Sequence, residues 1–209
     1  VYQVVYLADA EIEIDGVLSE EEWGNAKAER GFCFPWEKGK SPETEFRSFC
    51  DDEFFYFCFI VEDSEVVVEE EFETEEVVSR EDRVEIFFSR DADLGRYFCI
   101  EVDPRGRVHS YAARYYRHFD SSWELEGLRT VSLITDSGYT VEGSIALSSL
   151  ERLGLVTPCC RDVVLTGVFR AEFFEGDVLP EEHWISWVRP KTKQADFHVP
   201  SAFGCFVFH

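Results

Sequence analysis

Several features are scarce in this sequence of 209 residues. Methionine is absent, only 5 of the 20 basic residues are lysine, and no Gly/Ser/Pro-rich stretch divides the chain. No apolar run approaches the ~20 residues that a membrane-spanning helix needs, which argues against membrane insertion. Because no linker is visible, and all-β chains of this length commonly form one domain, we expect a single domain over residues 1–209.

The cysteines do not have the spacing of a zinc site. There are seven of them, an odd number, and no CxxC pair occurs, so the sequence indicates neither a zinc site nor a complete disulfide framework. One disulfide, for example from Cys50 to a distant partner, stays open as an alternative. The seven cysteines also leave open a location in a reducing compartment.

The net charge of −23 limits the partners. A chain this acidic repels phosphate backbones, which argues against nucleic acid as a partner. Acidic polysaccharides and anionic membranes are disfavoured for the same reason. Neutral ligands, cations and basic partners remain, and a solvated acidic surface is the simplest explanation of the charge.

The apolar composition favours strands. Hydrophobic residues make up 45% of the chain, and phenylalanine alone numbers 20, enough for a large core and typical of sheets. Short helices are predicted at a capping box with Ser19 as N-cap and at Ser149–Gly154. Alternating or apolar runs predict strands at residues 2–7, 11–14, 44–50, 54–62, 83–89, 96–103, 107–116, 129–135, 139–146, 162–174 and 203–208. This pattern predicts an all-β fold, a two-sheet antiparallel β-sandwich of the jelly-roll or immunoglobulin-like kind with one or two short helices.

Residues 82–88 carry the most informative alternation. Val84, Ile86 and Phe88 share one face and belong to a core, which leaves Glu85 on the other face. The next strands add more polar and aromatic residues to that second face, so that it carries Glu85, Phe87, Tyr97, Glu101, His109 and Tyr111. Such a surface is either a solvated face with cross-strand pairs or a sugar site, where rings stack on pyranoses and carboxylates hold hydroxyls.

An ordered set of motifs resembles the family 9 carbohydrate-binding modules. The set consists of Ile14-Asp15-Gly16-Val17-Leu18 with Trp23, Asp52 with Phe54-Phe55-Tyr56, Asp82-Arg83-Val84-Glu85-Ile86-Phe87, Gly138-Tyr139-Thr140-Val141-Glu142, Ile185-Ser186-Trp187, Phe197-His198-Val199-Pro200 and Phe203-Gly204. The resemblance implies a β-sandwich of the module and DOMON type. It also implies a non-catalytic protein that grips the reducing end of a glycan and carries structural calcium.

Residue by residue, the resemblance is partial. Glu85 stands at the family's sugar-contacting glutamate, but Ser79 and Phe197 stand where the family has its two sandwiching tryptophans, and Cys99 stands at an arginine. We therefore predict a remodelled glycan site. It consists of Glu85, Arg170, Trp184, Trp187, Phe197 and His198. Core packing for Trp187 and loop fixation for His198 are the alternatives.

Acidic residues at strand ends and turns suggest a cation. Asp63, Asp91, Asp93 and Asp103 are the candidate calcium ligands, because carboxylate oxygens at turns can converge on one ion. None has EF-hand spacing, and solvated acidic turns are the alternative.

The function favoured by the sequence is non-catalytic binding of a neutral poly- or oligosaccharide in a glycan-degrading system, with a glycoside hydrolase as partner. Catalysis is not expected because no convergent carboxylate pair can be identified. A haem module is disfavoured by the absence of methionine. The alternative is a structural or protein-interaction domain that has lost the sugar clamp. The resemblance implies an extracellular or periplasmic location; Val1 opens the chain without a signal peptide, which export would have removed.

Overall fold

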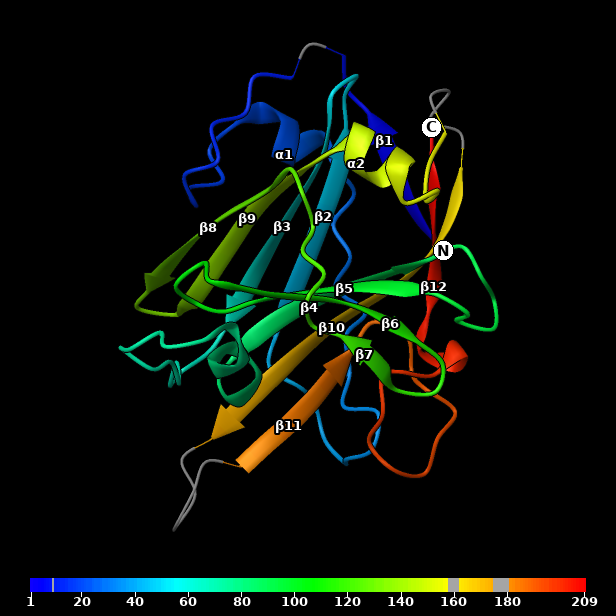
Figure 1. The fold of residues 1–209 in the computed structure, drawn as a ribbon. Helices are drawn as coiled ribbons and strands as arrows, with labels where there is room; N and C mark the ends of the chain where they lie inside the picture. The colour runs from blue at the N-terminus through cyan, green and yellow to red at the C-terminus, as the bar shows by residue number, and fades with distance from the viewer. Residues whose placement is uncertain (9, 158–161, 175–180) are drawn as a thin grey trace.

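The computed structural model describes residues 1–8, 10–157, 162–174 and 181–209, which form two β-sheets packed face to face (Figure 1). The predicted two-sheet all-β sandwich is confirmed. Sheet A contains β7 (His118–Asp120), β6 (Val108–Arg114), β5 (Tyr97–Val102), β4 (Arg83–Ser89), β10 (Val163–Phe174), β12 (Gly204–Phe208) and β11 (Glu181–Ser186), which pairs with β10. Sheet B contains β2 (Thr44–Cys50), β3 (Phe54–Glu62), β9 (Gly138–Ala146) and β8 (Leu128–Thr135).

The first strand, β1 (Tyr2–Tyr6), belongs to both sheets. Its first residues pair with β12, and Val5 and Tyr6 pair with β2. Both pairings are parallel, so the sandwich is not purely antiparallel as predicted; the other strand pairs among the described residues are antiparallel.

The helices are short and lie between strands. They are α1 (Glu21–Asn25), the 3₁₀ helix η1 (Glu75–Arg80), α2 (Leu147–Arg152) and the 3₁₀ helix η2 (Pro200–Ala202). The predicted capping box is wrong, because Glu20 is the N-cap of α1 and makes no side-chain capping bond. Ser19 instead closes a turn, with its N–H on the Val17 carbonyl at 2.6 Å. The segment 11–14 is not a strand either.

The main core lies between the two sheets. In β3, Phe55, Phe57 and Phe59 face the inward residues of β4 and are fully buried. The other face of β3 is covered as well, because Tyr56 and Cys58 pack under the N-terminal segment that carries Trp23. This confirms the prediction that a strand apolar on both faces is central and covered on both sides.

The outer face of sheet A is also covered. Phe197, Val199 and Ala202 come from the C-terminal loop and pack over Phe87 and Phe169. Because the C-terminal loop covers this face, polar side chains on the same face are shielded from bulk water. The candidate site on this face is therefore a small pocket under the loop rather than an open surface.

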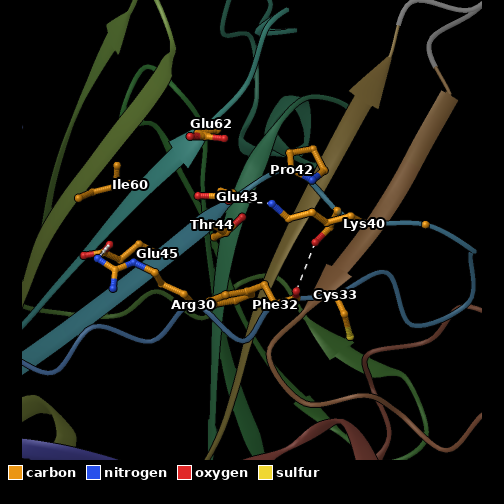
Figure 2. A pocket seen from close by; sticks show the side chains of 12 residues that line it. Arg30, Phe32, Cys33, Lys40, Pro42, Glu43, Thr44, Glu45, Ile60 and Glu62 are labelled. Carbon is orange, nitrogen blue, oxygen red and sulfur yellow. Dashed lines mark hydrogen bonds and ion pairs between the residues drawn. The ribbon is translucent and has the colours of Figure 1, made fainter.

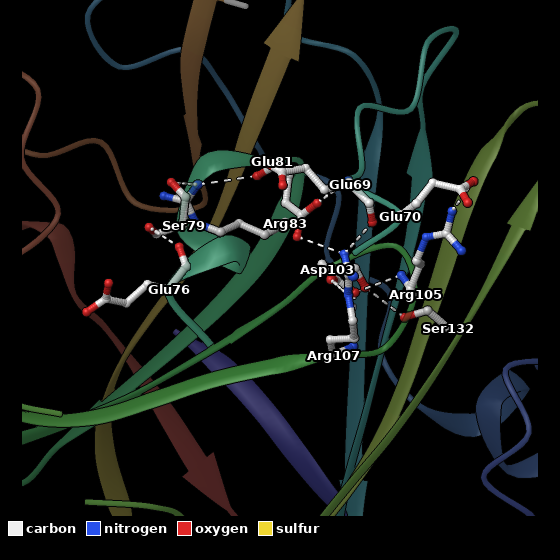
Figure 3. A network of polar contacts seen from close by, with 10 residues as sticks. All are labelled: Glu69, Glu70, Glu76, Ser79, Glu81, Arg83, Asp103, Arg105, Arg107 and Ser132. Atoms are coloured by element: carbon white, nitrogen blue, oxygen red, sulfur yellow. Dashed lines mark hydrogen bonds and ion pairs between the residues drawn. The ribbon is translucent and has the colours of Figure 1, made fainter. Parts of the chain in front are cut away.

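The acidic segment 64–81 is fixed to sheet A by ion pairs (Figure 3). The guanidinium of Arg107 contacts the carboxylates of Asp103 and Glu81 and the Glu69 carbonyl. Burial raises the pKa of Glu81 to about 7, although the Glu69 N–H and Arg107 oppose the shift.

In the described part of the chain, no helix has both the length and the apolar character to cross a membrane.

Candidate functional site

Strand register places Glu85 at the centre of the outer face of sheet A. Glu85 pairs with Glu101 on β5, and Glu101 pairs with His109 on β6. In the same way, Phe87 lies on the row that carries Tyr111. The predicted shared face is therefore confirmed. Unlike a solvated face, however, it is closed, since Glu85 is only 2% exposed.

One arginine holds three carboxylates at this position. The Nε of Arg83 donates to Glu85 Oε1 at 2.9 Å and lies 3.2 Å from Glu101 Oε2. Its Nη2 donates to Glu182 Oε1 at 3.2 Å. The guanidinium carbon lies 5.3 Å from the centroid of the Trp184 ring, within the range of a cation–π contact.

The cluster has more carboxylates than cations, and this excess of negative charge favours the protonated form of a carboxyl group. Burial raises the pKa of Glu85 to about 8, and the neighbouring Glu101 adds to the rise while Arg83 opposes it. Burial also raises the pKa of Glu182, again against Arg83. A cluster of this kind retains a proton at neutral pH.

One acceptor in the cluster receives no hydrogen bond. Glu101 Oε1 accepts the Tyr111 hydroxyl at 2.8 Å, but Glu101 Oε2 is buried without a hydrogen-bond partner among the described residues. The nearby Arg83 Nε–H is donated to Glu85 instead. Glu101 therefore offers a lone pair to a hydroxyl donor entering the pocket.

Aromatic rings enclose the polar cluster. Phe197 stacks on Phe169 with ring centroids 4.0 Å apart, and its edge meets Trp184 at 5.1 Å. His198 stacks on Phe87 at 5.2 Å.

His198 is also held by polar contacts. Its Nδ1 shares a hydrogen bond of 3.0 Å with the Tyr97 hydroxyl. Burial, assisted by Arg117, lowers the pKa of His198 to about 4, so this imidazole is neutral at physiological pH.

The opening at this cluster is narrow. Its cavity volume is about 60 Å³, and its lining consists of Arg83, Glu85, Glu101, Arg117, Trp184, Ala195, Asp196, Phe197 and His198. Small-molecule pockets commonly measure about 300–1,000 Å³. The opening therefore admits one edge of a sugar ring rather than the whole ring.

Two predicted site residues lie elsewhere. Arg170 pairs with Val84 in the register of β10 and β4, so its side chain enters the sandwich interior, on the face opposite to Glu85. Trp187 packs against the inter-sheet core, and its ring centroid lies 5.8 Å from the ring centroid of Phe206. The site brings together Glu85, Trp184, Phe197 and His198, and the prediction that Arg170 and Trp187 join them is not met because both belong to the inner layer.

The four predicted calcium ligands do not come together. Asp91 and Asp93 are exposed in the turn before β5. Asp103 already faces the guanidinium of Arg107, which takes the place that a cation would occupy (Figure 3). Only Asp63 belongs to a carboxylate group of the right size. Its partners are Asp82 and Glu172, and one ligand oxygen from each of the three lies within 4.8 Å of the others.

These three residues fit the calcium that the resemblance implies. They supply hard oxygen ligands only, as calcium requires. Asp63 Oδ2 is buried without a hydrogen-bond partner among the described residues. Asp82 and Glu172 were not among the predicted ligands, because Asp82 was assigned to the motif that carries Glu85 and Glu172 lies far from Asp82 along the chain.

A larger groove lies on the outer face of sheet B (Figure 2). Its volume is about 810 Å³, and it runs between segment 30–43 and the strands β2 and β3. Ile60, which is 40% exposed, lines it. Two ion pairs lie at its rim, Arg30 with Glu45 at 2.5 Å and Lys40 with Glu43 at 2.7 Å, and Glu62 adds a further carboxylate. No candidate residue from the sequence lies there.

The chain matches a family model over residues 14–209, and that model describes the "Carbohydrate family 9 binding domain-like" family. This protein belongs to that family. The earlier resemblance is thereby confirmed, and the membership supports carbohydrate binding. No curated protein matches the chain.

Solved structures share the fold of this family 9 domain at 18% sequence identity. A Bacteroides uniformis ATCC 8492 protein has a TM-score of 0.76, with coverage of 99% of this chain and 98% of its own. A family 9 module from Caldicellulosiruptor kristjanssonii in complex with glucose has a TM-score of 0.64, with coverage of 98% and 94%. The same organism's module in complex with cellotriose gives 0.62, with 98% and 92%. At this identity, these structures establish the fold.

The rings around Glu85 differ from those that the resemblance implies. Ser79, at the position of the first tryptophan, is exposed on η1 and donates its hydroxyl to the Glu76 carbonyl (Figure 3). Its own carbonyl accepts Arg83 Nη1 at 3.1 Å. The large ring beside Glu85 is instead Trp184 of β11, which the register of β10 and β11 places next to Arg83.

Proposed function

We propose that this family 9 domain binds a neutral oligo- or polysaccharide without cleaving it, and that one edge of a sugar enters the pocket at Glu85 and Glu101. The observation that carries the proposal is Glu101 Oε2, which accepts no hydrogen bond from the described residues and lies in a pocket that also contains a guanidinium and aromatic rings. Sugar hydroxyls donate to carboxylates, and their C–H faces pack on rings such as Trp184. A charge-assisted hydrogen bond of this kind contributes about 1.5–3 kcal/mol.

The neutral character of the ligand follows from charge. The cluster has three carboxylates against Arg83, and the chain carries a net charge of −23. A uronic acid or sulfated sugar would be repelled by both. We include in the proposal a location outside the cytoplasm and a role beside a glycoside hydrolase, supported by the family membership. Fractionation of the native host tests the location, and recovery in the cytoplasm would contradict it.

Calorimetric titration with glucose, cellotriose and other neutral glucans and xylans tests the site. We expect Glu101→Gln and Trp184→Ala each to weaken binding at least tenfold, because each removes a direct contact while Arg83 keeps its other carboxylates. Glu43→Gln is the matched control, since Glu43 lies on the rim of the groove on sheet B.

The groove is the competing position for the ligand. Ile60→Arg would obstruct it and leave the Glu85 pocket intact. Loss of binding in Ile60→Arg but not in Glu101→Gln would contradict the proposed position. Absence of binding in the wild type would favour the structural or interaction domain instead.

A further inference from the structure

A basic cleft lies at the exposed end of β6 and β7. Its volume is about 630 Å³, and its lining includes Arg96, Arg114, Arg117, Phe119 and Asp120. The three arginines are exposed, and none of them forms an ion pair with a carboxylate of the described residues. In a chain with a net charge of −23, this cleft is a region of the opposite sign.

Asp120 does not neutralise the basic cleft. Its Oδ1 accepts the hydroxyl of Ser122 at 2.6 Å and the N–H of the same residue at 3.2 Å. These bonds lower the pKa of Asp120, and Arg96 and Arg114 contribute to the same shift. One carboxylate beside three guanidiniums leaves an excess of positive charge, which attracts an anionic group.

Exposed aromatic rings lie beside the arginines. Phe119 and Tyr116 are 51% and 50% exposed, and the guanidinium carbon of Arg117 lies 5.9 Å and 6.0 Å from their ring centroids. Arginine and aromatic side chains are enriched in protein interfaces, where they supply much of the binding free energy. The basic cleft therefore offers both charge and apolar area to a protein partner.

The segment before η1 has the complementary composition. Its acidic tip, defined as Glu71, Phe72 and Glu73, is exposed. Neither glutamate forms an ion pair with the described residues. Phe72 is 43% exposed, and the guanidinium carbon of Arg107 lies 5.0 Å from its ring centroid. A phenylalanine between two glutamates matches a cleft in which arginines flank an exposed ring.

The acidic tip and the basic cleft lie toward opposite ends of β6. Glu75, which follows the tip, has its Oε2 3.6 Å from Nδ1 of His109 near the start of β6. The basic cleft instead adjoins β7, which pairs with Ala112–Arg114 at the end of β6. A strand of seven residues spans about 20 Å. The acidic tip accordingly does not line the cleft of its own chain.

We propose that two copies of this chain form a dimer in which the acidic tip of each copy enters the basic cleft of the other. Two copies placed antiparallel along β6 bring both tips to both clefts through one two-fold axis. The contact then closes as a dimer and does not continue as a filament. β7 is the edge strand of sheet A, so no other described strand of this sheet separates the two copies.

The overall charge of each copy opposes the dimer at long range. At about 0.15 M salt the Debye length is about 8 Å, so repulsion between distant carboxylates is screened and the groups in contact decide. We therefore expect association near physiological salt. The dimer should weaken at about 1 M salt, where a Debye length of about 3 Å also screens the charges at the contact.

Sedimentation equilibrium of the full chain over a range of concentrations tests the proposal, and we expect a reversible monomer–dimer equilibrium. The cleft variant is Arg96→Glu with Arg114→Glu, and the tip variant is Glu71→Lys with Glu73→Lys. Each should raise the dimer Kd about tenfold or more, because like charges then meet. All four side chains are exposed, so both variants should keep the wild-type Tm.

A mixture of the two variants distinguishes this contact from other causes of association. The cleft variant has an acidic tip and an acidic cleft, and the tip variant has a basic tip and a basic cleft. Each contact in a mixed dimer therefore joins opposite charges, and an equimolar mixture should recover the wild-type affinity. Glu11→Lys with Glu13→Lys is the matched control for net charge. It changes exposed residues of the N-terminal segment and should dimerise at least as tightly as the wild type.

Three results would overturn the proposal: a monomeric wild type, a wild-type Kd in either variant, and a mixture that stays monomeric. A monomeric wild type that binds a polyglutamate peptide, with the binding lost in the cleft variant, would assign the basic cleft to a different acidic partner and would also overturn the dimer. Sugar titration of the two variants is a separate measurement, because the dimer does not depend on the proposed sugar site.

Discussion

Arg83 and Arg170 lie on opposite faces of sheet A, and each faces three carboxylates. In the outer cluster, defined as Arg83 with Glu85, Glu101 and Glu182, the arginine reaches all three acids at 2.9–3.2 Å. In the inner cluster, defined as Arg170 with Asp63, Asp82 and Glu172, the arginine contacts only Glu172 closely. Two clusters made of the same types of side chain therefore differ in how closely the arginine contacts its carboxylates.

The two clusters leave different polar atoms without a hydrogen bond from the described residues. In the outer cluster, Glu101 Oε2 accepts no hydrogen bond from the described residues and lies beside aromatic rings, which suits a hydroxyl donor. In the inner cluster, Asp63 Oδ2 and the Tyr139 hydroxyl form no hydrogen bond with the described residues and lie near an acidic cleft. The two clusters have the same number of carboxylates, so this number does not distinguish them. The contacts of the arginine in each cluster do distinguish them.

Removing either arginine should have the largest effect. Arg83→Met and Arg170→Met each leave buried carboxylates without their cation, which costs about 3–5 kcal/mol of the free energy of unfolding. Urea denaturation in EDTA measures both. Calcium should restore much of the loss in Arg170→Met, because an ion in the inner cluster replaces the missing charge, but not in Arg83→Met. If calcium raises the free energy of unfolding equally in the two variants, the proposed difference between the two clusters is wrong.

Removing the free acceptor should have the next largest effect. Glu101→Gln loses a charge-assisted bond to the sugar, and a loss of about 1.5–3 kcal/mol corresponds to a Kd that is about 10–150 times larger. Asp82→Asn, in the inner cluster, should leave the sugar Kd within about threefold. Calorimetric titration with the same glucan measures both variants, and equal losses would show that the clusters do not act separately.

The pH dependence of stability should reveal the outer cluster. Because the pKa of Glu85 is raised to about 8 from its ordinary 4.5, the folded state holds a proton that the unfolded state releases between these values. Stability is therefore highest at the acidic end of this window and falls as the pH rises through it. Glu85→Gln should make this fall, measured by Tm between pH 5 and 8, less steep. Burial also raises the pKa values of Glu81 and Glu172 to about 7 and that of Asp82 to about 8, so these groups contribute the remaining slope.

A surface glutamate supplies the control for this pH effect. Glu126 is exposed and pairs with Arg152 at 2.9 Å, so Glu126→Gln should shift the Tm little at any pH. If Glu85→Gln shows the same pH slope as the wild type, the raised pKa is not a property of Glu85.

The smallest effect is expected from the sheet B groove. Ile60→Arg changes a side chain that is 40% exposed, and surface substitutions of this kind alter stability by about 0.5 kcal/mol or less. Its sugar affinity, measured by calorimetric titration, should match the wild type. A loss of affinity would move the sugar to the groove.

Much of the fold was readable from local alternation. The continuous apolar run at residues 54–62 and the period of two at residues 83–89 predict strands, and the structure places strands over these same residues. Their shared faces followed as well, because neighbouring antiparallel strands with short turns have few possible registers. The strand predicted at residues 2–7 covers all of β1, but the parallel pairing of β1 with β12 connects segments near the two ends of the chain and has no local signal.

The candidate site was predicted only in part, for a similar reason. Strand β11 was not predicted, yet it delivers Trp184 and Glu182 to Arg83. Arg170 was placed at the wrong site because alternation says which residues share a face, but not which face of β10 is the inner one. The cover over Glu85 depends on the C-terminal loop, which carries no periodic pattern.

The most direct test of the central claim is the place where a sugar binds. Two-dimensional NMR of ¹⁵N-labelled protein can follow the indole N–H signals during titration with cellotriose, with Trp184→Phe used to assign the Trp184 signal. The account predicts that the Trp184 indole shifts and saturates, while the backbone signals of Cys33 and Ile60 in the groove stay in place. Saturating shifts at Cys33 and Ile60 with an unmoved Trp184 would contradict it.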